Sequence, residues 1–197
     1  GGADTASASD FTAASGTLTF AQGETSKTFT VQTTQDALFE GNESFTVSLA
    51  SATAGATISA TNGAATGTIV DDDGTPTITH VGDAAGTVSN VTVAEGVAAV
   101  FTVNLSNAST TATSFALALT DGAAVVGSDY TNAMVFSNGV TYNSGTGTIS
   151  VPAGVASFTV TVPTVNDAIY EPTEAFNLAV GGVNATGTIT DNDAAPV

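Results

Sequence analysis

The amino-acid sequence predicts an all-β protein made of tandem antiparallel β-sandwiches. Thr, Val, Gly, Ser and Ala dominate it, and apolar side chains alternate with polar ones. The same three residues, Phe-Thr-Val, open the alternating segments at residues 29–31, 45–49, 101–105 and 158–162. A period of two is typical of a strand with one buried face. Clusters of Gly, Asn and Asp interrupt these segments about every 8–12 residues, as expected for the short strands of a sandwich.

The sequence also repeats itself, which predicts two units of the same fold. Acidic and aromatic positions recur in the same order in both halves. The offsets between matched segments are unequal, so the two copies differ by insertions in their loops. The matched pairs are residues 36–45 with 167–176, residues 67–73 with 187–193, and residues 9–12 with 128–131, at offsets of 131, 120 and 119.

The two predicted domains are unequal in content. The second, residues 76–197, has 52 residues (76–127) ahead of its matched Ser128, and we expect it to be a complete sandwich. The first, residues 1–75, has only eight residues ahead of its matched Ser9. We therefore expect it to be the C-terminal part of a sandwich, whose first strands come from upstream sequence or from a neighbouring chain. The strand candidates of the second domain that lack a counterpart are residues 77–81, 88–93, 98–105 and 114–120.

A turn signal lies in the middle of the second domain. Asn138-Gly139 separates two short alternating segments, residues 135–136 and 140–142. Asn-Gly is the strongest short signal for a two-residue turn between paired strands, because both residues readily adopt positive φ. The sequence therefore predicts a β-hairpin here.

The charge composition excludes several classes of partner. The chain has 18 Asp and Glu residues against one basic residue, Lys27, which gives a net charge of −17. Such a surface repels phosphate, so we expect no nucleic-acid partner. No apolar run reaches the roughly 20 residues of a membrane span, so we expect no membrane insertion. Cysteine is absent, and a bound metal is one way to stabilise a small extracellular domain that has no disulfide.

Fourteen of the 18 acidic residues occupy matched positions in loops and at strand ends. Two like charges 4 Å apart repel by roughly 4 kcal/mol at an effective dielectric constant of about 20, and one Lys cannot neutralise such clusters. Ca²⁺ takes six to eight carboxylate and carbonyl oxygens, and fits this donor set better than Mg²⁺ or Zn²⁺. The alternative is that these are solvated loop charges, but their repetition at one internal spacing favours metal binding. The candidates are Asp10, Asp36, Glu40, Glu43, Asp71, Asp72 and Asp73 in the first unit, and Glu95, Asp129, Asp167, Glu171, Glu174, Asp191 and Asp193 in the second.

At these residues the chain resembles the Calx-beta motif, a calcium-binding immunoglobulin-like domain first associated with sodium/calcium exchangers. It is also similar to the Calx-beta-like repeats of large bacterial adhesins of the RTX type, which are exported by type I secretion. The matching stretches are residues 9–20 and 23–31, the Asp-x-x-x-Glu-x-x-Glu segments and the Asp-rich ends. The resemblance implies tandem immunoglobulin-like (Calx-beta-like) sandwiches that hold Ca²⁺ at the tip of each domain.

The resemblance also implies which groups bind the ion. The ligands fall on the seven candidates of the second unit and on their counterparts in the first, which lacks a counterpart of Glu95. The backbone carbonyl of Ile169, and that of Leu38 in the first unit, corresponds to a further ligand. Three positions depart from the family pattern: Gln35, Asn166 and Asn192.

These observations predict a non-enzymatic, calcium-stabilised repeat of an extracellular or bacterial cell-surface protein that acts as a spacer or stalk. Its expected partners are adjacent repeats or neighbouring copies of the chain, with no small-molecule substrate. The main alternative is a subunit of a self-assembling filament, matrix or surface layer, with strands exchanged between chains. A calcium-sensing regulatory module is a third possibility. Enzyme classes are disfavoured, because His80 is the only His with no nucleophile elbow nearby and no Trp is available for sugar stacking.

Overall fold

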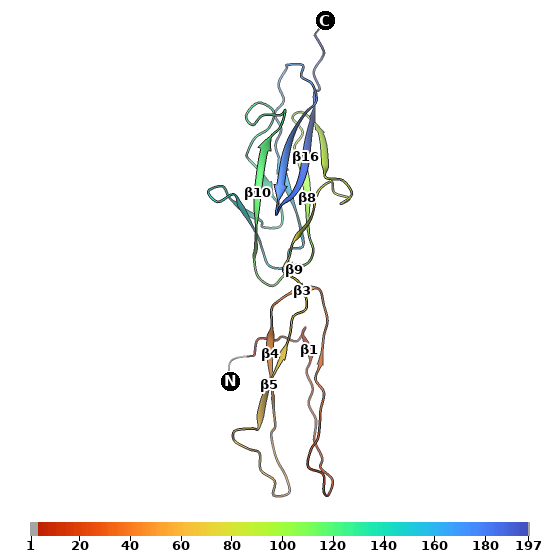
Figure 1. Cartoon of the computed structure of the whole chain (residues 1–197), viewed down its shortest axis with the longest axis vertical. Helices are drawn as coiled ribbons and strands as arrows, with labels where there is room; N and C mark the ends of the chain where they lie inside the picture. Colours follow the sequence, from red (N-terminus) through yellow and green to blue (C-terminus); the bar gives the residue numbers. More distant parts are fainter. Residues whose placement is uncertain (1–3, 197) are drawn as a thin grey trace. The chain divides into compact units, whose positions relative to one another are not determined.

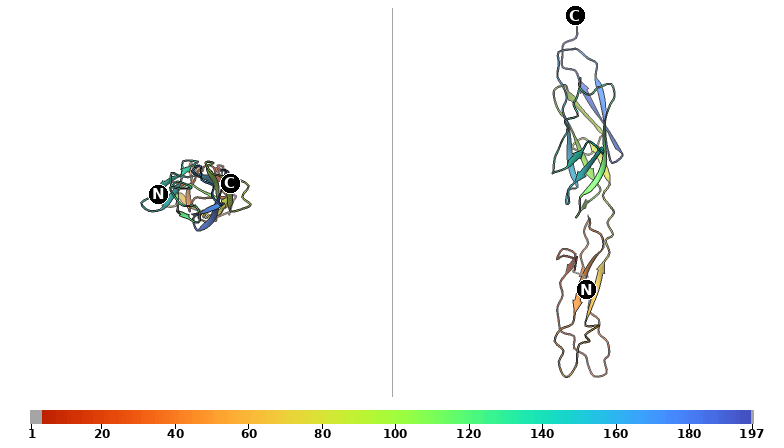
Figure 2. Two further views of the ribbon diagram at one scale, coloured as in Figure 1. Left: turned by 90° about the horizontal axis from the view of Figure 1, so that it is seen from above. Right: turned by 90° about the vertical axis from the view of Figure 1, so that its left-hand side faces the viewer.

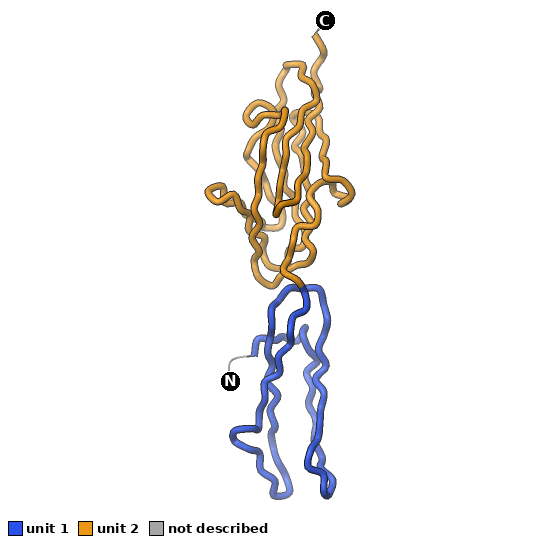
Figure 3. The backbone as a smooth tube through the Cα atoms, viewed as in Figure 1, with its two compact units in different colours: residues 1–73 blue, residues 74–197 orange. Residues whose placement is uncertain are grey.

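The computed structural model describes residues 4–196, and all of their regular structure is β. The chain divides into two compact units, unit 1 (residues 1–73) and unit 2 (residues 74–197) (Figure 3). Within the described residues, no helix is long and apolar enough to cross a membrane. The all-β sandwich fold predicted from the sequence is confirmed.

Unit 2 is a sandwich of two sheets whose inner faces enclose one core (Figures 1 and 2). Neighbouring strands are antiparallel, except that β16 and β7 are parallel. A short strand, β9 (Ala108–Ser109), precedes β10. In spatial order, one sheet contains β11 (Val135–Phe136), β14 (Ser157–Val162), β8 (Ala99–Leu105) and β6 (Ile78–Gly82), and the other contains β12 (Thr141–Asn143), β13 (Thr148–Val151), β10 (Thr113–Asp121), β15 (Glu174–Val180), β16 (Val183–Thr190) and β7 (Asn90–Ala94).

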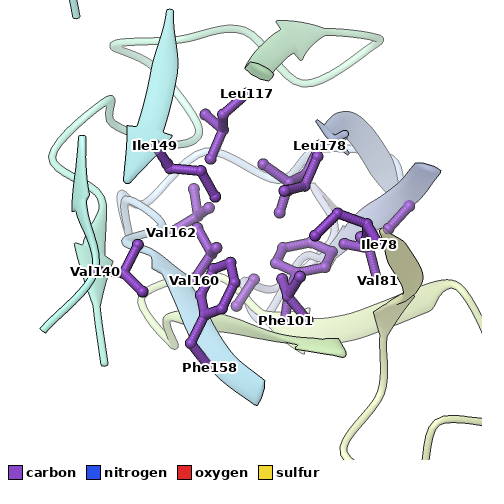
Figure 4. Close-up of a cluster of buried hydrophobic side chains, with 14 of the residues drawn as sticks. Ile78, Val81, Phe101, Leu117, Val140, Ile149, Phe158, Val160, Val162 and Leu178 are labelled. Carbon is purple, nitrogen blue, oxygen red and sulfur yellow. The ribbon is translucent and has the colours of Figure 1, made fainter. Parts of the chain in front are cut away.

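The core of unit 2 forms because alternate residues of these strands point inward (Figure 4). Phe101, Phe158 and Phe176 are almost completely buried, and the ring of Phe101 meets that of Phe176 edge-on at 6.0 Å between centroids. Tyr130 stacks on Phe176 at 4.6 Å, and its hydroxyl donates a hydrogen bond to Asp121 at 2.5 Å. Burial of such side chains is the dominant favourable term in folding. Tyr130, which follows Asp129 in the sequence, therefore packs in the core.

The predicted hairpin at Asn138-Gly139 is wrong, although the tight turn exists. Asn138 has φ of 55° and Gly139 has φ of 72°, which are values typical of a two-residue turn. The flanking strands do not pair with each other, because β11 pairs with β14 in one sheet and β12 pairs with β13 in the other. The turn therefore carries the chain from one sheet to the other.

The described residues of unit 1 form two short strand pairs with each other. β1 (Phe11–Thr12) pairs with β2 (Gln32–Thr33), and β4 (Glu43–Ser48) pairs with β5 (Ala64–Ile69). A further short strand, β3 (Leu38–Phe39), lies between β2 and β4 in the sequence. The ring of Phe11 stacks on Phe45 at 5.0 Å, as Tyr130 stacks on Phe176 in unit 2.

A glycine completes this aromatic contact in both units. Phe45 lies opposite Gly67 in the β4–β5 pair, and Phe176 lies opposite Gly187 in the β15–β16 pair. A Cβ atom at Gly67 would lie 2.4 Å from the Phe45 ring, and one at Gly187 would lie 2.2 Å from the Phe176 ring. Only glycine leaves room for the ring, so the repeat seen in the sequence is also a repeat of packing.

Residues 29–31 are not a strand, contrary to the sequence prediction, and the Phe29 side chain is exposed. Their counterparts at the offset of 131 lie in β14, which pairs with β8. The described residues of unit 1 contain no counterpart of β8. Alternation in the sequence thus marks a segment that suits a sheet, but the strand forms only where a partner is present.

Candidate metal centre

The acidic residues of unit 2 meet because three strands begin or end at the same edge of one sheet. β7 and β16 run parallel with Ala94 opposite Thr190, so Glu95 and Asp191 follow two adjacent strand ends. β15 is antiparallel to β16 and begins with Glu174 at the same edge. The loop before β15 supplies the remaining acids of the Asp-x-x-x-Glu-x-x-Glu segment. Sequence positions about 80 residues apart are therefore brought together by strand pairing.

Carboxylate oxygens in the described part of unit 2 form three groups, within each of which they lie no more than 4.8 Å apart. Glu171 and Glu95 each belong to two of the groups, so the groups join into one continuous acidic strip. A cavity of about 10 Å³, lined by all of these acidic residues except Asp193, has room for one body of the size of a water molecule. The groups are Asp129 with Glu171 and Glu174, Glu95 with Asp167 and Glu171, and Glu95 with Asp191 and Asp193.

Two buried oxygens of the acidic strip are suited to a cation. Oε1 of Glu95 and Oδ2 of Asp193 are buried and have no hydrogen-bond partner among the described residues. Buried polar atoms in proteins nearly always have a partner, and a buried unpaired charge is costly. Two ionised carboxylates cannot donate to each other. A divalent cation satisfies both oxygens, so the residues fit a bound metal.

The electrostatics of the strip agree with this interpretation. Burial raises the pKa of Glu95, and its contact with Asp193 and the neighbouring negative charges raise the pKa further. Burial also raises the pKa of Glu171 and of Glu174, followed by repulsion from acidic neighbours that include Asp129. In each case the protein disfavours the ionised carboxylate, which a cation would stabilise.

Backbone N–H groups hold the other carboxylates of unit 2 in place. Oδ1 of Asp167 accepts the N–H of Ile169 at 2.7 Å, which turns the loop. Asp191 accepts two N–H groups, from Glu171 at 3.0 Å and from Asp193 at 2.8 Å. These hydrogen bonds fix the loop backbone around the acidic strip, so the ligand geometry is organised before any ion binds.

Unit 1 repeats this hydrogen-bonding pattern. Asp36 accepts the N–H of Leu38 at 3.0 Å. Asp71 accepts the N–H groups of Glu40 at 3.0 Å, of Gly41 at 2.8 Å and of Asp73 at 3.0 Å. The donated N–H groups hold the pKa of Asp71 below its usual range, led by that of Gly41. The loop architecture is therefore shared by the two units.

The carboxylates of unit 1 form two groups that share no member: Asp10 with Glu40 and Glu43, and Asp71 with Asp72 and Asp73. Asp10 is buried and accepts the N–H of Ser7, which lowers its pKa. Burial raises the pKa of Glu40 and of Glu43, and the nearby Asp10 raises both further. Burial also raises the pKa of Asp73, ahead of the charge of Asp72.

The site of unit 1 is more open than that of unit 2. Its recess has a volume of about 280 Å³, and no described residue of unit 1 takes the place of Glu95. Asp36 lines this recess but belongs to neither carboxylate group. The side chain of Ile169 is exposed and that of Leu38 is half-buried, and the ligand roles of their carbonyls stay predictions.

Amides and one further acid take roles that the sequence did not indicate. Nε2 of Gln35 donates to Asp72 at 2.9 Å, and at the matching positions Nδ2 of Asn192 donates to Asn166 at 3.0 Å. The departures from the family pattern therefore tie the acidic loop to the terminal Asp-rich segment in each unit. Asp121, which accepts the Tyr130 hydroxyl, lies outside the matched segments, and no sequence signal marked it.

The fold and these sites define a class: an all-β sandwich repeat with an acidic, metal-suited tip in each unit. The comparisons with known proteins give the family. The Calx-beta domain family matches residues 1–73 and 85–194, so the chain belongs to it. The resemblance inferred from the acidic segments is thereby confirmed. Calx-beta domains bind Ca²⁺, which agrees with the donor sets described above.

Three solved structures are similar to parts of the chain. The crystal structure of the apo-form Calx CBD1 domain is 22% identical, with a TM-score of 0.43, over 53% of this chain and 92% of that one. CBD12 from CALX1.2 is 22% identical, with a TM-score of 0.43, over 53% and 43% of the two chains. The calcium binding domain CBD12 of CALX1.1 is 24% identical, with a TM-score of 0.43, over 55% and 45%. The search of curated proteins gave no significant match.

Proposed function

We propose that this chain binds Ca²⁺ at the tips of both units and serves as a calcium-stabilised structural repeat. The observation that carries the proposal is the acidic strip of unit 2, with its two buried, unpartnered oxygens on Glu95 and Asp193. Ca²⁺ suits an all-oxygen, irregular donor set, whereas Mg²⁺ demands a tight octahedron and Zn²⁺ prefers Cys and His. When bound, the ion supplies positive charge that a chain with one Lys lacks.

The proposed setting is extracellular, in a spacer or stalk on a bacterial surface. Two features support it: the chain has two tandem units and a net charge of −17. Millimolar calcium outside cells suits sites of modest affinity, of the order of 10⁻⁴–10⁻³ M. The role is mechanical and non-enzymatic, and the partners are adjacent repeats of the same kind.

The positions of the terminal acids suggest how calcium could act on such an array. Asp73 directly precedes Gly74-Thr75-Pro76, and Asp193 directly precedes Ala194-Ala195-Pro196. Short segments with proline are poor flexible linkers. A cation at each tip orders the residues next to these segments, and calcium thereby restricts the angles between neighbouring repeats.

Small-angle X-ray scattering with and without a calcium chelator tests the mechanical part of the proposal. In calcium we expect the maximum dimension of the chain to have a single, narrow distribution. After chelation this distribution should be broader and its mean should be shorter. The Asp73→Asn variant, altered at the tip that directly precedes Gly74-Thr75-Pro76, should move toward the chelated profile in calcium. Unchanged scattering together with calorimetric calcium binding would reject the mechanical role alone. Absence of calcium binding in the calorimeter would reject the proposed function as a whole.

A further inference from the structure

One candidate ligand of unit 2, Asp129, comes from a loop outside the main strands. This loop, residues 122–129, follows β10 and leads to Tyr130. Asp129 shares a carboxylate group with Glu171 and Glu174, whose oxygens lie within 4.8 Å of its own. Glu174 is fixed as the first residue of β15. The loop must therefore hold one conformation if Asp129 is to join this group.

A single oxygen atom of Asp121 closes the loop. Asp121 is the last residue of β10, and its Oδ1 accepts the N–H of Val126 at 2.9 Å and the hydroxyl of Tyr130 at 2.5 Å. The two donors lie on either side of Asp129 in the sequence. Asp121 itself belongs to none of the carboxylate groups of the described residues, and it does not line the cavity of the acidic strip. Any effect of Asp121 on ligand geometry is therefore exerted through the loop.

The core anchors the Tyr130 side of this contact. Tyr130 is 1% exposed and its ring stacks on Phe176, which in turn meets Phe101. Burial, followed by the hydrogen bond to Asp121, raises the pKa of the Tyr130 hydroxyl, so this group stays protonated and donates. The hydroxyl thereby fixes Asp121, and Asp121 fixes the middle of the loop at Val126.

Hydrogen bonds inside the loop connect this contact to Asp129. The N–H of Asp129 donates to the carbonyl of Val125 at 3.0 Å, and Oδ2 of Asp129 accepts the N–H of Val125 at 2.7 Å. The N–H of Gly127 donates to the carbonyl of Tyr130 at 2.7 Å. The loop therefore folds as one hydrogen-bonded unit around the residue that Asp121 holds.

Unit 1 cannot form the same pair, because Phe11 occupies the position of Tyr130 and has no hydroxyl. The Phe11 ring still stacks, on Phe45, so the fold accommodates phenylalanine at this position. The carboxylate of Asp10, the counterpart of Asp129, accepts the N–H of Ser7. In unit 1 the candidate ligand therefore holds this part of the loop itself.

The same backbone N–H thus has a different acceptor in the two units, since Ser7 corresponds to Val126 at the offset of 119. We infer that Asp121 and Tyr130 are positioning residues that hold the loop so that the Asp129 carboxylate faces the ion. This inference rests on the proposed function, because it concerns calcium binding by unit 2. Residues that orient metal ligands from outside the coordination shell typically affect metal affinity by roughly 10–100-fold.

Calcium titration of the full chain, followed by nuclear magnetic resonance, tests the inference, because amide signals report the two units separately. Tyr130→Phe removes one hydroxyl and keeps the ring, and Asp121→Ala removes the acceptor. We expect each variant to weaken calcium binding by unit 2 roughly tenfold or more, with signals from unit 1 unaffected. The double variant should bind no more weakly than Asp121→Ala, because the hydroxyl acts through that carboxylate. Losses that multiply in the double variant would overturn the inference.

Two control variants distinguish positioning from charge and from stability. Asp121→Asn removes the charge but keeps an oxygen acceptor, so it should recover most of the affinity lost in Asp121→Ala. Ile149→Val alters the buried core opposite Phe115, near the start of β10, and should lower the melting temperature without changing the calcium affinity. A loss in Asp121→Asn as large as that in Asp121→Ala would overturn the inference, since the charge alone would then be responsible.

Hydrogen exchange in the presence of a chelator gives a readout that is independent of calcium. The amide of Gly127 should exchange faster in Tyr130→Phe and in Asp121→Ala than in the parent, because the loop opens more often. Unchanged exchange at Gly127 would overturn the inference. Parent-like calcium binding by both variants would also overturn it, and the proposed function would stand. Absence of calcium-dependent shifts from unit 2 in the parent chain would instead reject the proposed function, and the inference with it.

Discussion

The carboxylate of Asp191 accepts the backbone N–H of Glu171 at 3.0 Å, although the two residues are 20 positions apart in sequence. Asp71 accepts that of Glu40 at 3.0 Å in the same way. In both units one acidic residue therefore fixes the backbone of another, whose own carboxylate accepts no backbone N–H among residues 4–196. The acids of each tip thus divide into those that hold the loops and those that repel one another, and substitutions of the two kinds should behave differently.

Glu171→Gln removes the negative charge of a side chain that belongs to two of the three carboxylate groups of unit 2. We expect the calcium affinity of unit 2 to fall roughly tenfold or more, because affinity follows the number of charged ligands. The melting temperature without calcium should stay the same or rise, since a repelled charge is lost. Isothermal titration calorimetry and thermal unfolding measure the two effects. Glu24→Gln is the control, because Glu24 pairs with Lys27 away from the tips, and an equal loss of affinity there would contradict the prediction.

Asp191→Asn should weaken the protein even without calcium. Asp191 accepts N–H groups with both carboxylate oxygens, and an amide keeps only one acceptor. An unsatisfied N–H costs about 1–3 kcal/mol when buried, and we expect about 1 kcal/mol at this half-exposed site. Urea unfolding of the chelated protein measures the difference. A variant as stable as the parent in chelator would show that these hydrogen bonds do not organise the loop.

The stability of calcium-free unit 2 should rise as the pH is lowered from 7 toward 5. Glu95, Glu171 and Glu174 have pKa values raised above the ordinary 4.5, so the folded state binds protons more readily than the unfolded chain. Their protonation stabilises the fold fully below the unfolded pKa, and this contribution is lost as the pH rises through the folded values. In unit 1 the raised pKa values of Glu40, Glu43 and Asp73 act in the same direction. The lowered pKa values of Asp10 and Asp71 oppose this trend only as the pH falls below their ordinary value of 3.8.

With calcium present the trend should reverse, because protons compete with the ion for the same oxygens. Melting curves of dialysed and calcium-loaded protein at pH 7, 6 and 5 should therefore converge as the pH falls. Nuclear magnetic resonance signals from unit 2 would distinguish its unfolding transition from that of unit 1. Parallel pH profiles with and without calcium would contradict this account.

Calcium should shift the unfolding transition in a concentration-dependent manner. A ligand that binds only the folded state stabilises it by about 2.7 kcal/mol at one hundred times its Kd. We therefore expect the melting temperature to rise steadily with free Ca²⁺ beyond saturation, and to rise much less with Mg²⁺ at equal concentration. Equal shifts with both ions would indicate general charge screening. Sodium chloride at matched ionic strength provides the control.

Gly187→Ala should destabilise unit 2 more than Gly67→Ala destabilises unit 1. The new Cβ would meet the Phe176 ring at 2.2 Å in the first case and the Phe45 ring at 2.4 Å in the second. Overpacking of a core costs typically about 1–3 kcal/mol. Phe176 is completely buried, whereas Phe45 is half-buried and can move aside. Denaturant unfolding of the two variants gives the comparison, and equal losses would contradict it.

The sequence indicated those features that depend on local pattern. The alternation at residues 101–105 and 158–162 predicted strands, and both segments are strands of the core. The repeated spacing of acids predicted which carboxylates gather, because loops at one end of a sandwich converge. Asp36 is the exception among them: its carboxylate accepts the N–H of Leu38 and joins no carboxylate group.

The features that the sequence did not indicate depend on partners distant in the chain. Residues 29–31 have the same alternation as residues 158–162, but no described strand of unit 1 pairs with them. Asn138-Gly139 has the dihedral angles of its expected turn, yet the strands on either side find better partners in opposite sheets. A turn is a property of two residues, whereas pairing is decided by the whole sandwich.

The parallel pairing of β7 with β16 has a consequence for a protein under tension. Five residue pairs join the two strands, from Asn90 with Thr186 to Ala94 with Thr190. When β7 is pulled toward its own start and β16 toward its own end, the two strands slide in opposite directions. All the bridges between them then bear the load at once, in shear, instead of opening one after another. A cation held by the carboxylates that follow these two strands would oppose that sliding.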